Sequence, residues 1–200
     1  MSFKDFEFLK LYHYHFSEPE NLNDLRSLDL YRAFKDNLVE NHGKSKLETI
    51  EFIFNNLDLR SLRIPNSKLT YLPEGISKLS NLKSLDLYNN LLVTLPDDFT
   101  QLTNLTWLHL SSNHLYSLPA DFGNLRSLEI VYLSNNELSA LPESFGDLKN
   151  LQTVYIISGN QDLVLPKCIK NLTSEFLLDK SIIAKNKSNL EAWSVKYNGI

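Results

Sequence analysis

The sequence predicts an α/β solenoid, in which short parallel strands stack along one sheet. One observation is a period of 23 residues, and the other is a shared order of leucines, asparagine and a Leu-Pro pair within each period. A fixed period of this length is typical of stacked repeats, which bury their apolar side chains only against their neighbours. The blocks open at Leu59, Leu82, Leu105 and Leu128, and a fifth, one residue longer, opens at Leu151.

Each block combines a strand, a corner and an extended return segment. In the second block, LKSLDLYNNLLVTLPDDFTQLTN, Leu85 and Leu87 stand two positions apart, as in a strand with one buried face. Asn90 follows at the corner, where its amide can pair with backbone groups that would otherwise be buried without partners. Strands are expected near 62–64, 85–87, 108–110, 131–133 and 154–156, and the equivalent amides are Asn113 and Asn136.

The proline of each Leu-Pro pair shapes the return segment. Pro96 locks φ and lacks an N–H, so the chain behind the corner is expected to be extended before a short helical turn. We therefore expect no regular helix longer than about two turns between residues 65 and 150.

This pattern resembles the leucine-rich repeat, in the short LxxLP form of intracellular Ras-group and LAP-type scaffolds and of many bacterial proteins. Only Ser67 departs from it in the first block, since the later blocks carry asparagine there. The resemblance covers about residues 59–172 and implies a leucine-rich-repeat horseshoe segment with a parallel, concave sheet. It also implies small GTPases or phosphatase catalytic subunits as a class of partner.

Residues 1–58 are expected to cap the first block, because an uncovered end would expose apolar side chains. The pattern between Asp24 and Asn41 favours an amphipathic helix, and Ser45 begins a capping box for a second helix through about Asn55. An alternative treats 25–30 and 47–55 as degenerate repeat strands. The missing LxxLP segment and the short distance to the first block favour the helical cap.

Residues 173–200 are expected to form a short C-terminal cap. Phe176, Leu177 and Leu178 suit a final strand, and the stretch from Ser188 to Trp193 suits a closing helix. We expect the indole of Trp193 to cover the last coil.

Composition excludes several classes of function. The chain has 200 residues, a net charge of −4 and no clustered stripe of Lys and Arg, so nucleic acid is not expected as a partner. Charges interrupt the N-terminal residues where a signal peptide would be apolar, and no segment approaches a membrane span, so a cytoplasmic location is expected. The lone cysteine, Cys168, excludes an internal disulfide framework.

No catalytic motif occurs in the chain, and we expect a protein that is not an enzyme and needs no cofactor or metal. His13 and His15 lack a carboxylate or thiol at a matching distance, so cap histidines are favoured over a metal site. The neighbouring Lys167 and Lys170 are expected to lower the pKa of Cys168 somewhat, without an adjacent base to make it a nucleophile.

The candidate binding residues lie on the face of the sheet that points away from the core. We call it the sheet face. The third, fifth, seventh and eighth positions of each block are expected to point outward there. Aromatic and aliphatic side chains gather in these columns and are typical of protein interfaces. The candidate partner-binding residues are Arg63, Asp86, Tyr88, Trp107, His109, Ile130, Tyr132, Tyr155 and Ile157.

Two charged neighbours within this set suggest a dependence on pH. Asp86 is placed to pair with Arg63 on one side and with protonated His109 on the other. A carboxylate neighbour is expected to raise the pKa of the imidazole, so that binding changes across roughly pH 6 to 7.5.

The sequence thus favours a non-enzymatic module that binds a partner protein or peptide on the sheet face, as a monomer rather than a homodimer. One alternative is the recognition part of a bacterial effector-type enzyme, whose catalytic domain would have to lie outside this sequence. Another is a structural protein that associates with itself through its aromatic residues.

Overall fold

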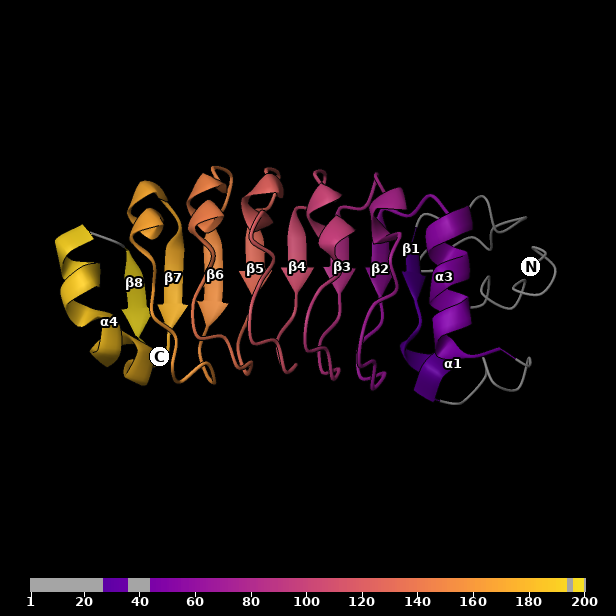
Figure 1. The fold of residues 1–200 in the computed structure, drawn as a ribbon, viewed down its shortest axis with the longest axis horizontal. Helices are drawn as coiled ribbons and strands as arrows, with labels where there is room; N and C mark the ends of the chain where they lie inside the picture. The colour runs from indigo at the N-terminus through magenta and orange to yellow at the C-terminus, as the bar shows by residue number, and fades with distance from the viewer. Residues whose placement is uncertain (1–26, 36–43, 194–195, 200) are drawn as a thin grey trace.

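The computed structural model describes residues 27–35, 44–193 and 196–199, which form one eight-stranded parallel sheet with its strands in sequence order (Figure 1). The predicted α/β solenoid is confirmed. The strands lie side by side in one long row, with a helix at each end. They are β1 (Ser27–Asp29), β2 (Ser61–Arg63), β3 (Ser84–Asp86), β4 (Trp107–His109), β5 (Ile130–Tyr132), β6 (Thr153–Ile156), β7 (Glu175–Leu178) and β8 (Tyr197–Gly199).

The repeat strands begin one residue earlier than we expected. The predicted strand at 85–87, for example, is Ser84–Asp86, and it pairs with β2 through Leu62 opposite Leu85. The N–H of Leu87 still donates to the carbonyl of His109 at 2.9 Å, so the hydrogen-bonded ladder continues past the assigned end. The expected pairing register is unaffected by this shift.

Short 3₁₀ helices close each coil opposite the strands. None exceeds five residues, and residues 65–150 contain no longer helix, which confirms the effect predicted for the Leu-Pro pairs. Pro96, which precedes one of these helices, has a φ of −66° and ψ of 154°, as in polyproline II. The helices span Ile76–Lys78, Asp97–Gln101, Phe122–Asn124, Glu143–Asp147 and Lys167–Asn171.

A single apolar core runs through the coils. Leu85 of the strand, Leu87 just after it, Leu92 of the corner and Phe99 of the 3₁₀ helix are all fully buried, as are their equivalents in later blocks. Burying a side chain of this size stabilises a fold by about 2 kcal/mol, but each one is covered only with the help of adjacent coils. The repeats therefore stabilise one another.

A ladder of buried asparagines lines the corners. The Oδ1 atom of Asn113 accepts from the N–H of Leu92 at 3.1 Å, and its Nδ2 donates to the carbonyls of Leu87 and Leu110, both at 3.0 Å. Asn90 and Asn136 make equivalent bonds. Asn160 extends the ladder into the fifth block, where the inserted residue hid it from the sequence pattern.

The N-terminal cap differs from our expectation. The helix expected between Asp24 and Asn41 is wrong at its start, because β1 pairs in parallel with β2 and only Tyr31–Lys35 (α1) is helical among the described residues there. Leu28 and Leu30 are both fully buried, and the N–H of Leu30 donates to the carbonyl of Arg63 at 2.8 Å. Pairing with a neighbouring strand outweighs local helix propensity at these residues.

The second helix of this cap begins where the sequence predicts. Helix α3 (Lys46–Asn56) has Ser45 as its N-cap, and the side chains and backbones of Ser45 and Glu48 form the reciprocal bonds of a capping box. The alternative of degenerate repeat strands is therefore right for the described part of 25–30 and wrong for 47–55.

The C-terminal cap repeats the coil with a longer helix. The expected final strand is β7, helix α4 (Lys180–Trp193) follows it, and β8 adds a further strand that we did not expect. Within α4, Asn186 accepts from the N–H of Leu165 at 2.8 Å and donates to the carbonyl of Leu163, as a ladder asparagine would. The side chain of Trp193, like His13 and His15, lies outside the described residues.

Candidate functional site

Four rings form a row along the middle of the sheet face, and we call this row the aromatic ladder: Tyr88, His109, Tyr132 and Tyr155. The first and last pairs are stacked, and the planes of His109 and Tyr132 are tilted by 47°. The centroids of successive rings are 5.0, 4.7 and 4.3 Å apart. Trp107 packs beside the row, 5.6 Å from the rings of both His109 and Tyr132. The structure therefore brings five of the predicted binding residues into mutual contact.

Strand register explains this stacking. His109 on β4 lies opposite Tyr132 on β5, which lies opposite Tyr155 on β6, because each residue occupies the fifth position of its block. Adjacent strands lie about 4.8 Å apart, close to the separation that stacked rings prefer. The 23-residue period thus sets the spacing of the last three rings. Tyr88 occupies the seventh position of its block and meets His109 diagonally, because Asp86 lies opposite His109.

The ladder is less exposed than the sequence suggested. Tyr88 is 38% exposed, whereas the side chains of Trp107, His109, Tyr132 and Tyr155 are half-buried. Each ring covers part of the next, so the rings brace one another as well as facing solvent. Ile130 and Ile157, also expected on this face, are half-buried beside the ladder.

Charged residues adjoin the ladder on its N-terminal side. Arg63 donates from Nε to Asp86 Oδ2 at 3.1 Å and from Nη1 to Asp29 Oδ2 at 3.0 Å, so it connects the carboxylates of β3 and β1. Asp86 is 5% exposed, and its Oδ1 also accepts from the backbone N–H of Tyr88 at 3.0 Å. The guanidinium is thus paired within the protein, and the carboxylate fixes the backbone at the start of the ladder.

The expected rise in the pKa of His109 is wrong in direction. His109 Nδ1 lies 3.6 Å from Asp86 Oδ1, as the columns predicted. Burial nevertheless lowers the pKa of His109 below its ordinary value of 6.5; the charge of Asp86 opposes this shift, and that of Arg63 adds to it. His109 is therefore mainly neutral at pH 7, and it titrates below pH 6.5 rather than above it. Burial also raises the pKa of Tyr132, which keeps that ring neutral.

The pKa of the lone cysteine is also shifted in the direction opposite to our expectation. Cys168 lies in the 3₁₀ helix Lys167–Asn171, and its Sγ is 3.8 Å from the carbonyl of Pro142. Burial raises the pKa of the Cys168 thiol, and the charge of Glu143 adds to this, so the expected lowering by nearby lysines is wrong. An uncharged thiol is a weak nucleophile.

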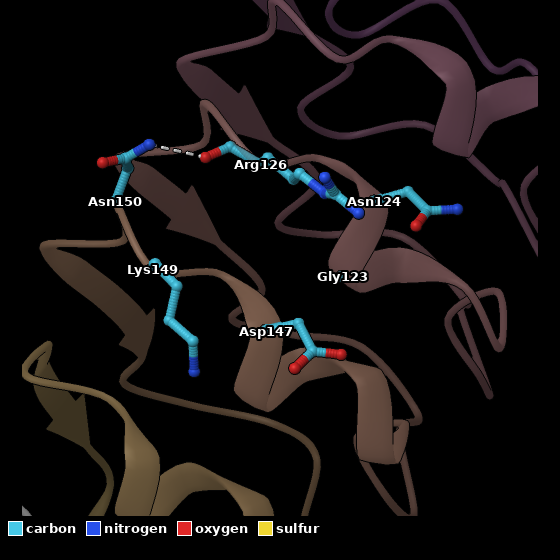
Figure 2. A pocket seen from close by; sticks show the side chains of 6 residues that line it. All are labelled: Gly123, Asn124, Arg126, Asp147, Lys149 and Asn150. Atoms are coloured by element: carbon cyan, nitrogen blue, oxygen red, sulfur yellow. Dashed lines mark hydrogen bonds between the residues drawn. The ribbon is translucent and has the colours of Figure 1, made fainter.

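Another candidate binding site is a depression of about 580 Å³ on the side of the coils opposite the sheet face (Figure 2). Its polar groups largely satisfy neighbouring backbone: Lys149 Nζ donates to the carbonyl of Gly146 and Asn150 Nδ2 to that of Arg126, both at 2.7 Å. A binding pocket needs apolar walls with a few convergent polar groups, which this seam between coils lacks. Its lining residues are Gly123, Asn124, Arg126, Asp147, Lys149 and Asn150.

The most exposed large apolar side chains lie outside the sheet face. They occupy the return segments just after the corner. The spacing signal for them is present in the blocks, since they recur between the tenth and fourteenth positions. We call this group the flank residues: Tyr71, Leu91, Val93, Tyr116 and Val164, which are 40% to 53% exposed.

The described residues contain no cluster of three or more His, Cys, Asp or Glu side chains placed to hold a metal ion. Within the same residues, no helix is long and apolar enough to cross a membrane.

Comparison with known proteins places this geometry in a family. Residues 58–115 match the model described as "Leucine rich repeat", and residues 103–144 match that described as "Leucine Rich repeats (2 copies)". No curated protein matches the chain significantly.

Solved structures resemble the chain over part of its length. A leucine-rich repeat protein of Leptospira interrogans is 32% identical, with a TM-score of 0.53, over 63% of this chain and 38% of that chain. For InlP of Listeria monocytogenes the identity is 29% and the TM-score 0.49, over 60% of this chain and 35% of that chain. This chain therefore spans well under two thirds of either protein's length.

Proposed function

Since the chain is a leucine-rich repeat protein, we propose that it is a non-enzymatic interaction module that grips a partner protein or peptide on the sheet face. The observation that carries this proposal is the aromatic ladder with Trp107 beside it. Aromatic side chains dominate the energetics of protein interfaces, because they bury much apolar area and keep a polar group at one end.

The ladder is also organised before any partner arrives. Contacts between successive rings restrict the rotamers of Tyr132 and Tyr155, whose centroids are 4.3 Å apart and whose planes differ by 7°. Ordering a flexible side chain at an interface costs about 0.5 to 1.5 kcal/mol, and stacked rings have lost most of that freedom already. The sheet face is therefore suited to binding with little rearrangement.

Binding to partner proteins from a native lysate tests this proposal. Three baits are compared: the wild-type chain, the double variant Trp107→Ala, Tyr132→Ala, and the double variant Val93→Ala, Tyr116→Ala of the flank residues. We expect a partner that the wild type and the flank variant retain and that the sheet-face variant loses. The resemblance to Ras-group scaffolds makes small GTPases and phosphatase catalytic subunits the first proteins to assay directly.

Thermal melting of all three baits controls for loss of fold, and sedimentation tests self-association. We expect the free wild-type chain to sediment as a monomer. A dimer that the Trp107→Ala, Tyr132→Ala variant breaks would favour a self-associating structural protein instead. Loss of the partner by the flank variant alone would move the binding site off the sheet face.

A further inference from the structure

The middle of the sheet face, on β4, β5 and β6, carries no Asp, Glu, Lys or Arg at its outward positions. The seventh and eighth positions of these blocks are serine, asparagine or isoleucine, and of the second positions, which precede the strands, only Glu129 is charged. A partner that lies across the middle therefore meets aromatic, aliphatic and hydroxyl groups. The outward third and fifth positions are Trp107, His109, Ile130, Tyr132, Thr153 and Tyr155.

The charged side chains on either side of this middle have partners within the protein. Arg63 pairs with the carboxylates of β1 and β3, at 3.0 and 3.1 Å. On the other side, Glu175 accepts a hydrogen bond from Nδ2 of Asn198, and Asp179 accepts from the backbone N–H two residues later at 2.7 Å. A charge that the partner brought to the middle would lose water and meet no opposite charge there, which is unfavourable.

His109 is the side chain at the centre of this region whose ordinary pKa lies near neutrality. Its ring centroid lies 5.0 Å from that of Tyr88 and 4.7 Å from that of Tyr132, and the indole of β4 is 5.6 Å away. The charged groups that face it are Asp86 on β3, 3.6 Å from Nδ1, and Arg63 on β2, which is paired with that carboxylate. Burial outweighs the attraction of Asp86 and lowers the pKa of the imidazole. A neutral ring therefore completes the uncharged middle.

We propose that the sheet face holds an apolar, uncharged stretch of its partner and releases that stretch on acidification, when His109 gains a proton. The inference rests on the proposed function and adds the chemistry of the partner and a control of its binding. The stretch covers the half-buried rings of Trp107, His109 and Tyr132. Removal of apolar area from water, rather than ion pairing, drives the association.

The direction of the pH effect follows from the burial of His109. An apolar stretch over the rings removes water that still reaches the imidazole, so the pKa of His109 is lower in the complex than in the free chain. Affinity is then constant above the pKa of the free chain and falls as the pH drops through it, because the free chain binds the proton more tightly. The attraction of Asp86 for protonated His109 opposes this shift without reversing it, as in the free chain.

Selection from a library of random peptides by the full chain, at about pH 7.5, tests the chemistry of the partner. The peptides recovered are counter-screened against the Trp107→Ala, Tyr132→Ala variant, so that only those dependent on the sheet face are kept. We expect this set to be enriched in apolar residues and depleted in Asp, Glu, Lys and Arg alike, relative to the input library. Their affinity should be nearly the same at low and high salt, because no charges pair across the interface.

Charge variants of both signs add a test on the protein side. Thr153→Lys and Thr153→Glu each place a charge at a half-buried third position of β6, and Thr94→Lys and Thr94→Glu make the same changes at an exposed return segment. We expect both Thr153 variants to weaken a recovered peptide several-fold and both Thr94 variants to leave it unchanged. Thermal melting checks that all four variants are folded.

Calorimetric titration of an uncharged recovered peptide between about pH 7.5 and pH 5 tests the release. The wild type is compared with His109→Gln and with His114→Gln, whose histidine is exposed away from the sheet face and lies 2.8 Å from Glu137 through Nδ1. We expect the wild type and His114→Gln to lose affinity several-fold on acidification and His109→Gln to lose little. NMR titration of the wild type should give a lower pKa for His109 with the peptide bound than without it.

The outcomes distinguish this inference from the proposed function. Peptides that need Trp107 and Tyr132 but are enriched in one sign of charge, or that either Thr153 variant tightens, would overturn the apolar stretch. An affinity that does not fall with pH, or a pKa of His109 that rises on binding, would overturn the release; either result leaves the sheet face as the binding site. If every recovered peptide binds the Trp107→Ala, Tyr132→Ala variant equally well, the proposed function itself fails, and this inference fails with it.

Discussion

Asp86 and His109 approach each other across two neighbouring strands, with 3.6 Å between Oδ1 and Nδ1, yet the imidazole is held neutral. A carboxylate at this distance favours the protonated form. The surrounding rings oppose it, because Tyr88, Trp107 and Tyr132 remove water that would hydrate the charge. Burial has the larger effect on the pKa.

Titration of His109 by NMR should give a pKa below 6.5 in the wild type. Asp86→Asn should lower it further, because the substitution removes the charge that opposes the shift. Equal pKa values in the two proteins would mean that the side chains do not interact, and a value above 6.5 would contradict the dominance of burial.

Stability should depend on pH through the same group. The unfolded chain binds a proton at His109 near pH 6.5, while the folded chain binds it only at lower pH. The stability that neutral His109 contributes is thus fully present above pH 6.5 and is lost as the pH falls through the pKa of His109 in the folded chain. Denaturant unfolding at several pH values measures it, and His109→Gln should flatten the dependence in this window.

Asn113→Ala should destabilise the fold by about 1 to 3 kcal/mol, because it removes partners from buried backbone groups of two coils. Urea unfolding measures the change. Asn89→Ala is a poor control, since Asn89 has a φ of 52° and alanine disfavours that conformation by about 1 to 2 kcal/mol. Asn89→Gly suits the backbone and should cost little stability. Equal losses of stability for Asn113→Ala and Asn89→Gly would contradict the stabilising role of the buried asparagines.

Ser112→Asn should stabilise the protein by roughly 0.5 to 1 kcal/mol. Ser112 has a φ of 59°, and asparagine occupies the same position in three other blocks with φ between 52° and 54°. Asparagine tolerates this left-handed conformation better than serine does. Thr94→Asn is the control, because Thr94 is exposed outside the positive-φ positions. A rise in melting temperature for both variants would point to a general effect of asparagine.

Cys168 should react slowly with iodoacetamide at pH 7.5 compared with a free cysteine. Burial raises the pKa of its thiol, so the thiolate that attacks the reagent is scarce. The rate should rise with pH and reach that of a free cysteine only after denaturation in urea. A native rate as fast as the denatured one would show that the thiol is exposed and ionised.

The sequence alone determined the features that repeat at constant spacing or depend on adjacent residues. The buried pair Leu85 and Leu87, the capping box of Ser45 and Glu48, and the column from Asp86 to Tyr155 follow from period and local chemistry. Each needs only the position of a residue within its coil, and every coil has the same geometry.

Tertiary structure decided whatever depends on all the neighbours of a residue at once. The strand at Ser27–Asp29 forms because β2 offers its edge, which local propensity does not report. The flank residues are exposed because no adjacent coil covers them. The pKa of His109 falls because stacked rings exclude water more effectively than Asp86 supplies charge. Column positions specify which side chains meet, but the balance of solvation and charge between them depends on how completely the assembled rings bury the site.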